Sequence, residues 1–434
     1  MNDAPGWAAP TAAVAGQGAH RRAIGAAVAC NVIEFFDFVA YAFFAAAIGR
    51  AFFPSKEAGF SLLLSVAVFG VGFIARPLGS IVIGRYADRA GRRPAMLLTA
   101  VLMTGATLGL ALVPGHASIG LAAPILFTAL RIVQGFALGG EIGPSTAFLL
   151  EVAPPGRRAS YVALQLFSQG MATVLAAALG LALSGALDAQ AMAAWGWRVP
   201  FAASVLLVPL ALYLRSGMPE TLASASPAPE RGAGGHPLWR DGRVVLGIGA
   251  IAGGTVATYV GSYMATYGTT VLKLPPANGL QAALAIGLAT MAGALAGGWL
   301  ADRFGRWPVM FWPRLVSAVL IVPAFLLLAA HPDRATLLGV SAALAFLTAA
   351  NGGGVLTTIC ELFPAGQRAV GLALVYSMGV SLFGGSTQFL VTWLIEATGS
   401  PLAPAWCVSA ASVLALLAIL RMPETRPLTR LNNC

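Results

Sequence analysis

Twelve stretches of predominantly apolar residues recur along this chain, and each is about as long as a membrane-spanning helix. A helix of roughly 20 apolar residues crosses the hydrocarbon core of a bilayer. Only 10% of the residues are charged, against roughly 25% in soluble domains. The pattern predicts an all-α polytopic membrane protein with twelve transmembrane helices. The stretches cover residues 23–48, 60–83, 94–113, 119–148, 160–186, 198–215, 244–268, 277–300, 308–330, 335–359, 369–395 and 402–421.

The longest polar stretch divides these helices into two equal groups. Residues 216–243 are rich in Pro, Gly, Ser and charged side chains, a composition typical of a linker. We therefore predict one bundle of six helices over residues 23–215, a central loop over 216–243 and a second bundle over 244–421. Residues 1–22 and 422–434 are predicted to be tails.

Basic residues are distributed unequally between the two sides of the predicted membrane. Of the 26 Lys and Arg residues, 18 lie on the side that holds both termini and five on the other side. Cytoplasmic segments carry such an excess, which places both termini in the cytoplasm. The net charge of +10 is thus a topology signal, and no nucleic-acid partner is expected. The four cysteines have no metal-ligand spacing, and neither a metal nor a cofactor is predicted.

Three motifs occur twice, in the same order and at nearly one offset. "GRYADRAGRR" (84–93) is repeated as "GWLADRFGRW" (298–307), an offset of 214. "EVAPPGRR" (151–158) returns as "ELFPAGQR" (361–368), and "MPET" occurs at 218–221 and 422–425. Each motif lies at a predicted cytoplasmic edge. Two similar halves indicate a transporter whose substrate binds near the midplane between them.

These motifs resemble those of the major facilitator superfamily. Residues 84–93 match its loop signature Gly-x-x-x-Asp-Arg-x-Gly-Arg-Arg, and the second copy departs from it at Trp307. "RIVQGFALGG" (131–140) is similar to the family's fourth-span motif. "WGWRVPF" (195–201) and "GFIARPLGS" (72–80) resemble its metabolite–proton symporter branch, nearest to citrate and tricarballylate symporters. The resemblance implies two pseudo-symmetric six-helix halves and a functional monomer in a bacterial inner membrane.

Three acidic residues in the predicted spans are candidates for proton coupling. Glu34 and Asp37 lie roughly 14–18 Å along the first span, about half of a 30 Å core. Glu141 lies in the fourth span, nearer the cytoplasm. Arg131 has a similar depth to the first two. The resemblance to the superfamily implies that the first and fourth spans both border the central cavity, so we expect Arg131 to face Glu34 or Asp37. A purely structural role, in which these groups bond to helix ends or to neighbouring backbone, remains the alternative.

Candidate substrate-binding residues are the other polar groups at membrane depth. A buried guanidinium suits a carboxylate because it binds both oxygens. Asn351 precedes three glycines and is expected to break the tenth span beside a wet cavity. For Tyr259 and Tyr263 the alternative is ordinary packing. For Arg76 the alternative is that the side chain extends toward the membrane surface, so that its charge reaches water. The candidates are Asn31, Arg76, Arg131, Gln134, Tyr259, Tyr263, Asn351 and Gln388.

The repeated motifs are predicted to be gates. In the superfamily that they resemble, such charges bond across helices and hold the outward-facing state. Simple anchoring of the positive side would explain the arginines, but not the aspartates at identical positions. The predicted gating residues are Gly84, Asp88, Arg89, Gly91, Arg92, Arg93, Glu151, Arg158, Asp302, Arg303, Gly305, Arg306, Glu361 and Arg368.

The predicted function is uptake of a small organic anion, such as citrate, together with protons. A symporter for another metabolite (shikimate, an aromatic acid, 2-oxoglutarate, betaine or proline) is the alternative. A proton-antiporting exporter is less favoured, because the fifth span lacks the prolines usual in such proteins. An enzyme or a receptor is not expected, since no nucleophile motif, metal cluster or phosphate loop is present.

Overall fold

The computed structural model describes residues 17–54, 58–216, 242–364 and 367–426, and every regular element within these ranges is a helix. The predicted central loop lies almost wholly outside the described residues. Six long helices make up the first part of the chain: α1 (Gln17–Phe52), α2 (Ala58–Ala90), α3 (Arg92–Leu112), α5 (Ala122–Val152), α7 (Leu164–Ala186) and α9 (Val199–Ser216). Short helices join them: α4 (His116–Ile119), α6 (Arg158–Val162), α8 (Ala189–Ala194) and the 3-10 turn η1 (Gly196–Arg198).

The second part of the chain has the same plan. One span there is interrupted, because α14 passes through a π-helical segment, η4, before it continues as α15. The elements are α10 (Gly242–Thr270), α11 (Pro276–Phe304), α12 (Arg306–Ala330), α13 (Arg334–Leu362), α14 (Arg368–Gly379), η4 (Val380–Gly384), α15 (Gly385–Thr398) and α16 (Ala403–Ile419).

The helices are long and apolar enough for a membrane protein. Ten described segments meet both criteria for crossing a bilayer. Helices α9, with 18 residues, and α16, with 17, lie where the sixth and twelfth spans were predicted. Large apolar side chains face outward, among them Ile74, Leu121 and Leu206, which are 74–80% exposed. The predicted fold class, an all-α polytopic membrane protein, is confirmed.

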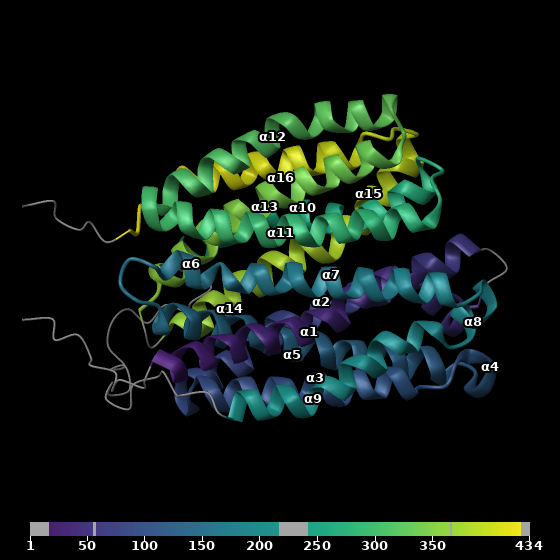
Figure 1. Cartoon of the computed structure of the whole chain (residues 1–434), viewed down its shortest axis with the longest axis horizontal. Helices are drawn as coiled ribbons and strands as arrows, with labels where there is room; N and C mark the ends of the chain where they lie inside the picture. The colour runs from purple at the N-terminus through teal and green to yellow at the C-terminus, as the bar shows by residue number, and fades with distance from the viewer. Residues whose placement is uncertain (1–16, 55–57, 217–241, 365–366, 427–434) are drawn as a thin grey trace, which may run out of the picture.

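The long helices run side by side in two groups. Figure 1 shows α1, α2, α3, α5, α7 and α9 together in one layer, and α10 to α13 with α15 and α16 in the other. Contacts between α7 and α11, and between α2 and α14, join the two groups. The start of α1 and the last described residues lie at the same end of the bundle (Figure 1).

The tenth span is continuous, so the predicted break at Asn351 is wrong. Helix α13 runs without interruption from Arg334 to Leu362. Its glycines serve close packing: a Cβ on Gly352 would lie 2.6 Å from Leu166, and one on Gly354 would lie 3.1 Å from Met310. The roughly 1 kcal/mol that glycine costs in a helix is offset by contacts with neighbouring helices.

Helices α2 and α5 cross at glycines, as the Gly-x-x-x-Gly step in the fourth span predicts. A Cβ on Gly135 would lie 1.8 Å from the carbonyl oxygen of Gly72, and one on Gly139 would lie 2.1 Å from that of Arg76. Because backbone rather than a movable side chain occupies the space, any larger residue must push the two helices apart. This crossing fixes α2, and with it Arg76, against α5.

We expect Gly135→Val to destabilise the protein strongly. The substitution should lower the free energy of unfolding by at least the ~1–3 kcal/mol typical of overpacking, because two backbones must separate. The melting temperature of purified protein in detergent measures the effect. Gly105→Val on α3 is the matched control, since a Cβ there meets nothing within 4 Å. Equal melting temperatures for the two variants would contradict the role of this crossing.

Candidate functional site: a central cavity and two charged clusters

A cavity of about 170 Å³ lies between the two groups of helices. Its walls come from α1, α2, α7, α10, α11, α13 and α14, so both groups contribute. Of the described residues that line it, Arg76 is the one with a charged side chain, and no carboxylate faces the cavity. Most of the remaining surface is apolar or hydroxylic. A cavity of this kind favours a small anion over a cation.

Several polar atoms around the cavity have no hydrogen-bond partner. The Nε and Nη2 atoms of Arg76, Nε2 of Gln169 and Oγ1 of Thr348 are all buried and unpaired. Arg76 is only 4% exposed, and its guanidinium stacks on Phe73 at 4.2 Å and on Phe38 at 4.7 Å. An unpaired buried donor costs about 1–3 kcal/mol. A ligand that accepts these hydrogen bonds would recover that free energy.

A buried network beside the cavity connects Arg131 to Asp37. Arg131 donates to Gln134 at 2.6 Å, Gln134 donates to Thr107 at 2.8 Å, and Thr107 donates to Asp37. The expected direct pair of Arg131 with an acidic residue on α1 is therefore not formed: Gln134 and Thr107 lie between them. The Arg131 guanidinium also stacks on Tyr41 at 4.0 Å.

A second, smaller cavity holds both acidic residues of α1. Its volume is about 20 Å³, and Glu34 and Asp37 line it together with Thr104, Thr107 and Ser204. A space of roughly 10–15 Å³ holds one water molecule. The two carboxylates thus share a small chamber among α1, α3 and α9, apart from the central cavity.

Phe38 lies between the two sites. Its ring lines the central cavity and is 4.7 Å from the guanidinium of Arg76 and 5.8 Å from that of Arg131. It also follows Asp37 directly in the chain. The ring of Phe38 therefore lies close to the guanidinium groups of both Arg76 and Arg131.

Other predicted site residues lie away from the cavity. Asn31 bonds to α7, where it contacts Gln165 and Ser168. Glu141 accepts a hydrogen bond of 2.5 Å from Thr99 on α3. Tyr263 packs in an apolar cluster of the second group and accepts a weak bond from Thr392. These contacts join helices to one another.

Three predicted substrate-binding residues, Arg76, Tyr259 and Asn351, do line the central cavity, whereas Gln388 does not. Sequence reasoning missed Thr348 and Tyr376, which also line it. Both are ordinary residues in apolar spans, and no spacing pattern distinguishes them.

The first charged cluster links the two groups at one end of the bundle. Arg92 bonds to Asp88 and lies 3.4 Å from Glu151. Arg368 at the start of α14 reaches the same Glu151 at 3.5 Å, and the backbone N–H of Val370 donates to Asp88 at 3.3 Å. The cluster therefore spans α2, α3, α5 and α14.

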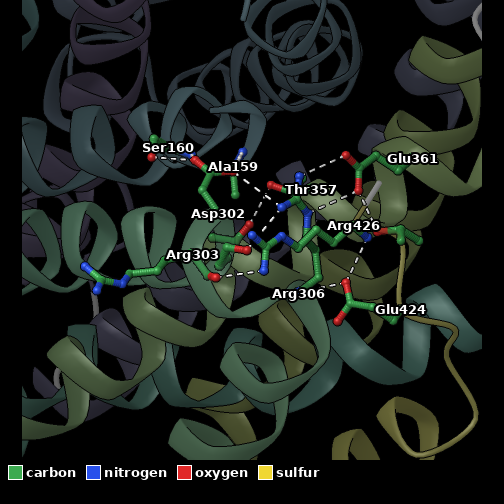
Figure 2. Close-up of polar contacts among 12 residues, drawn as sticks. Ala159, Ser160, Asp302, Arg303, Arg306, Thr357, Glu361, Glu424 and Arg426 are labelled. Carbon is green, nitrogen blue, oxygen red and sulfur yellow. Dashed lines mark hydrogen bonds and ion pairs between the residues drawn. The ribbon is translucent and has the colours of Figure 1, made fainter. Parts of the chain in front are cut away.

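The second cluster repeats this plan in the other group (Figure 2). Arg306 lies 3.4 Å from Asp302 and 3.2 Å from Glu361. Asp302 then reaches across to the start of α6, where it accepts bonds from the backbone of Ala159 (2.9 Å) and Ser160 (2.8 Å) and from the Ser160 hydroxyl (2.6 Å). In both copies, the aspartate binds backbone N–H groups of the opposite half.

The remaining predicted gating residues surround these clusters. Gly91 and Gly305 have φ angles of 111° and 106°, a region that favours glycine, and they join successive spans. Gly84 lies against Val370 of α14, 3.2 Å from where its Cβ would be. The side chains of Arg89, Arg158 and Arg303 are exposed, and that of Arg93 is half-buried.

Two groups of membrane-spanning helices, a cavity between them and matched charged clusters at one end define a secondary transporter. Comparison with known proteins agrees. The model of the Major Facilitator Superfamily matches residues 27–382, and the chain belongs to this family. It is therefore a multi-pass membrane transporter and not an enzyme, as predicted.

Relatives of known activity fall in the predicted branch. The chain is 36% identical to a citrate-proton symporter of Klebsiella pneumoniae, covering 89% of this chain and 88% of the relative. It is 32% identical to an alpha-ketoglutarate permease of Escherichia coli (92% and 93% covered), and 30% identical to a proline/betaine transporter of Salmonella typhimurium (94% and 85%). A solved structure of a proton:xylose symporter matches with a TM-score of 0.77 at 17% identity, covering 94% of this chain and 97% of that one.

Proposed function

We propose that this protein imports a small organic anion, such as citrate, together with protons by alternating access. The observation that carries the proposal is Arg76: a buried cation with unpaired donors on the wall of the central cavity. No acidic side chain among the described lining residues competes for it. A substrate carboxylate would accept hydrogen bonds from Nε and Nη2 of Arg76, and Gln169 and Thr348 would bind further oxygens.

The proton is proposed to travel on Asp37. Burial without a directly bonded cation favours the neutral carboxyl, whereas the nearby charge of Arg131 favours the carboxylate. Because of this balance, a small change in the position of Arg131 would protonate or deprotonate Asp37. Substrate at Arg76 acts on that position through Phe38, whose ring contacts both guanidinium groups.

The two charged clusters are proposed to close the cytoplasmic side. The distribution of basic residues supports a topology with both termini in the cytoplasm, and the clusters would lie at the cytoplasmic edge of each half in that topology. Their bonds across the halves would hold the cavity shut on this side while substrate enters from outside. The proposed location is a bacterial inner membrane, with the monomer as the working unit.

A 2-oxoglutarate symporter is the second candidate, because an alpha-ketoglutarate permease is 32% identical over nearly the whole chain. Its substrate, which also carries carboxylates, would bind to the same cation, Arg76. A betaine or proline symporter is disfavoured by the positive cavity, since the cationic group of a zwitterion would find no carboxylate among the described lining residues.

Uptake of labelled citrate and 2-oxoglutarate into proteoliposomes, with acid outside, tests the proposal. We expect accumulation above equilibrium that a protonophore abolishes. Arg76→Gln should raise the apparent KM about 10- to 100-fold, as loss of a charge-assisted bond predicts. Arg50→Gln, an exposed cation at the end of α1, is the control and should transport normally. Protonophore-insensitive uptake would exclude proton coupling.

A further inference from the structure

A second buried guanidinium lies behind the other wall of the central cavity. Arg314 on α12 is fully buried. Its Nη2 donates to Oδ1 of Asn351 at 2.8 Å, while Nε and Nη1 have no hydrogen-bond partner. None of the ion pairs in the described part of the chain includes it. A buried charge without a counter-ion is expensive, which points to an anion supplied from outside.

The link between Arg314 and the cavity is Asn351. This residue lines the cavity, and its Nδ2 donates one hydrogen to the carbonyl of Met310 at 2.5 Å. Because Arg314 holds Oδ1 and Met310 holds one Nδ2 hydrogen, the orientation of the amide is fixed. The second Nδ2 hydrogen remains for a ligand.

Two glycines keep the wall in front of Arg314 thin. Gly254 of α10 lines the cavity, and a Cβ there would lie 3.2 Å from Nη2 of Arg314. On the neighbouring Gly253 a Cβ would lie 3.1 Å from Cδ of the same arginine. Since no side chain at either position stands between the guanidinium and the cavity, its positive charge acts on whatever the cavity holds.

We propose that Asn351 and Arg314 form a second carboxylate subsite, in which Asn351 makes the contact and Arg314 supplies the charge. The inference rests on the proposed transport of an organic anion and narrows its substrate to anions with at least two carboxylates. One carboxylate binds Arg76 on α2, and another binds the subsite on α12 and α13. Such a substrate joins the two halves of the transporter.

This arrangement ties selectivity to charge. A monocarboxylate occupies one subsite and leaves the other empty, so it gains only part of the binding free energy. A zwitterion brings a cationic group into a cavity that is lined by the guanidinium of Arg76 and has that of Arg314 behind its wall. A ligand shifts a conformational equilibrium only by its differential affinity for the two states, and the dicarboxylate alone bonds both halves at once.

Binding of citrate, succinate and acetate to the full-length protein in nanodiscs tests the subsite. For Arg314→Gln we expect the Kd of citrate and succinate to rise about 10- to 100-fold and that of acetate to change less than about 3-fold, a difference well below one hydrogen bond to a charged group. Arg314→Lys, which keeps the charge, should recover most of the citrate affinity. Arg50→Gln is again the control. Asn351→Ala leaves Arg314 in place and should weaken citrate but not acetate, so it replaces Arg314→Gln if that variant does not fold.

The outcomes separate the subsite from the proposed function. If the wild-type protein binds citrate and Arg314→Gln or Asn351→Ala binds it equally well, the second subsite is refuted while anion transport stands. The subsite is likewise refuted if either variant weakens acetate as much as citrate. If no carboxylate binds the folded wild-type protein, the proposed function itself fails.

Discussion

Asp37→Asn is expected to abolish uphill transport while leaving exchange of substrate intact. An asparagine still accepts the hydrogen bond from Thr107 through its Oδ1, so the local packing survives. It has no proton to gain or lose, and a proton gradient therefore no longer drives the cycle. We expect accumulation in proteoliposomes to fall to the level of empty liposomes. Counterflow of labelled against unlabelled citrate should continue.

Glu34→Gln provides the comparison. Glu34 lines the same small cavity as Asp37, whereas the chain of hydrogen bonds through Thr107 and Gln134 to Arg131 begins at Asp37. We expect Glu34→Gln to slow accumulation without abolishing it. Full accumulation by Asp37→Asn would remove this residue from proton coupling. Loss of counterflow together with accumulation would instead indicate that the variant is inactive for another reason.

Features that depend on position along a helix were predictable from the sequence. The positions of the spans follow from apolar length, because a helix rises 1.5 Å per residue and must cross a fixed thickness. The repeated motifs placed Asp88 and Asp302 at equivalent helix ends, and the structure gives both a bond to the opposite half. Arg76 and Asn351, both candidate substrate-binding residues, lie in the wall of the central cavity.

Features that depend on rotation about a helix axis were not predictable. Arg131 and Asp37 have matching depth, yet side chains of α3 and α5 separate them. The tyrosines of α10 also have different surroundings because of their rotation about the helix axis. Residues four apart advance by about 40° beyond a full turn, so Tyr259 faces the cavity while Tyr263 and Tyr267 enter an apolar cluster.

A glycine in a span can either interrupt the helix or allow a neighbouring helix to approach closely, and the sequence alone did not distinguish these two roles. The run after Asn351 packs against Leu166 and Met310 inside an unbroken helix. The irregular segment lies instead at Val380–Gly384, where α14 becomes π-helical and Gly384 lies against the ring of Tyr259. What decides between a break and a close approach is the neighbouring helix, which only tertiary structure supplies.

Asp302→Ala is expected to open the cytoplasmic side of the transporter. The substitution removes all three bonds that Asp302 accepts from Ala159 and Ser160, while Arg306 keeps its pair with Glu361. Since a hydrogen bond to a charged group contributes about 1.5–3 kcal/mol, loss of even one shifts the equilibrium toward the open state at least about 10-fold. The matching Asp88→Ala removes a single bond across the halves and should have a smaller effect.

Maleimide labelling of Cys360 from the cytoplasmic side measures this opening. Cys360 is buried beside Glu361, and replacing the other three cysteines makes it the only target. Asp302→Ala should label several-fold faster than the parent protein. Asp333→Ala is the matched control, because Asp333 caps α13 by accepting a hydrogen bond from the backbone N–H of Thr336, which belongs to the same half. If Asp302→Ala and Asp333→Ala label equally, the cluster anchors helix ends only, and the gate of this transporter must be held by the contacts of α2 with α14 and of α7 with α11.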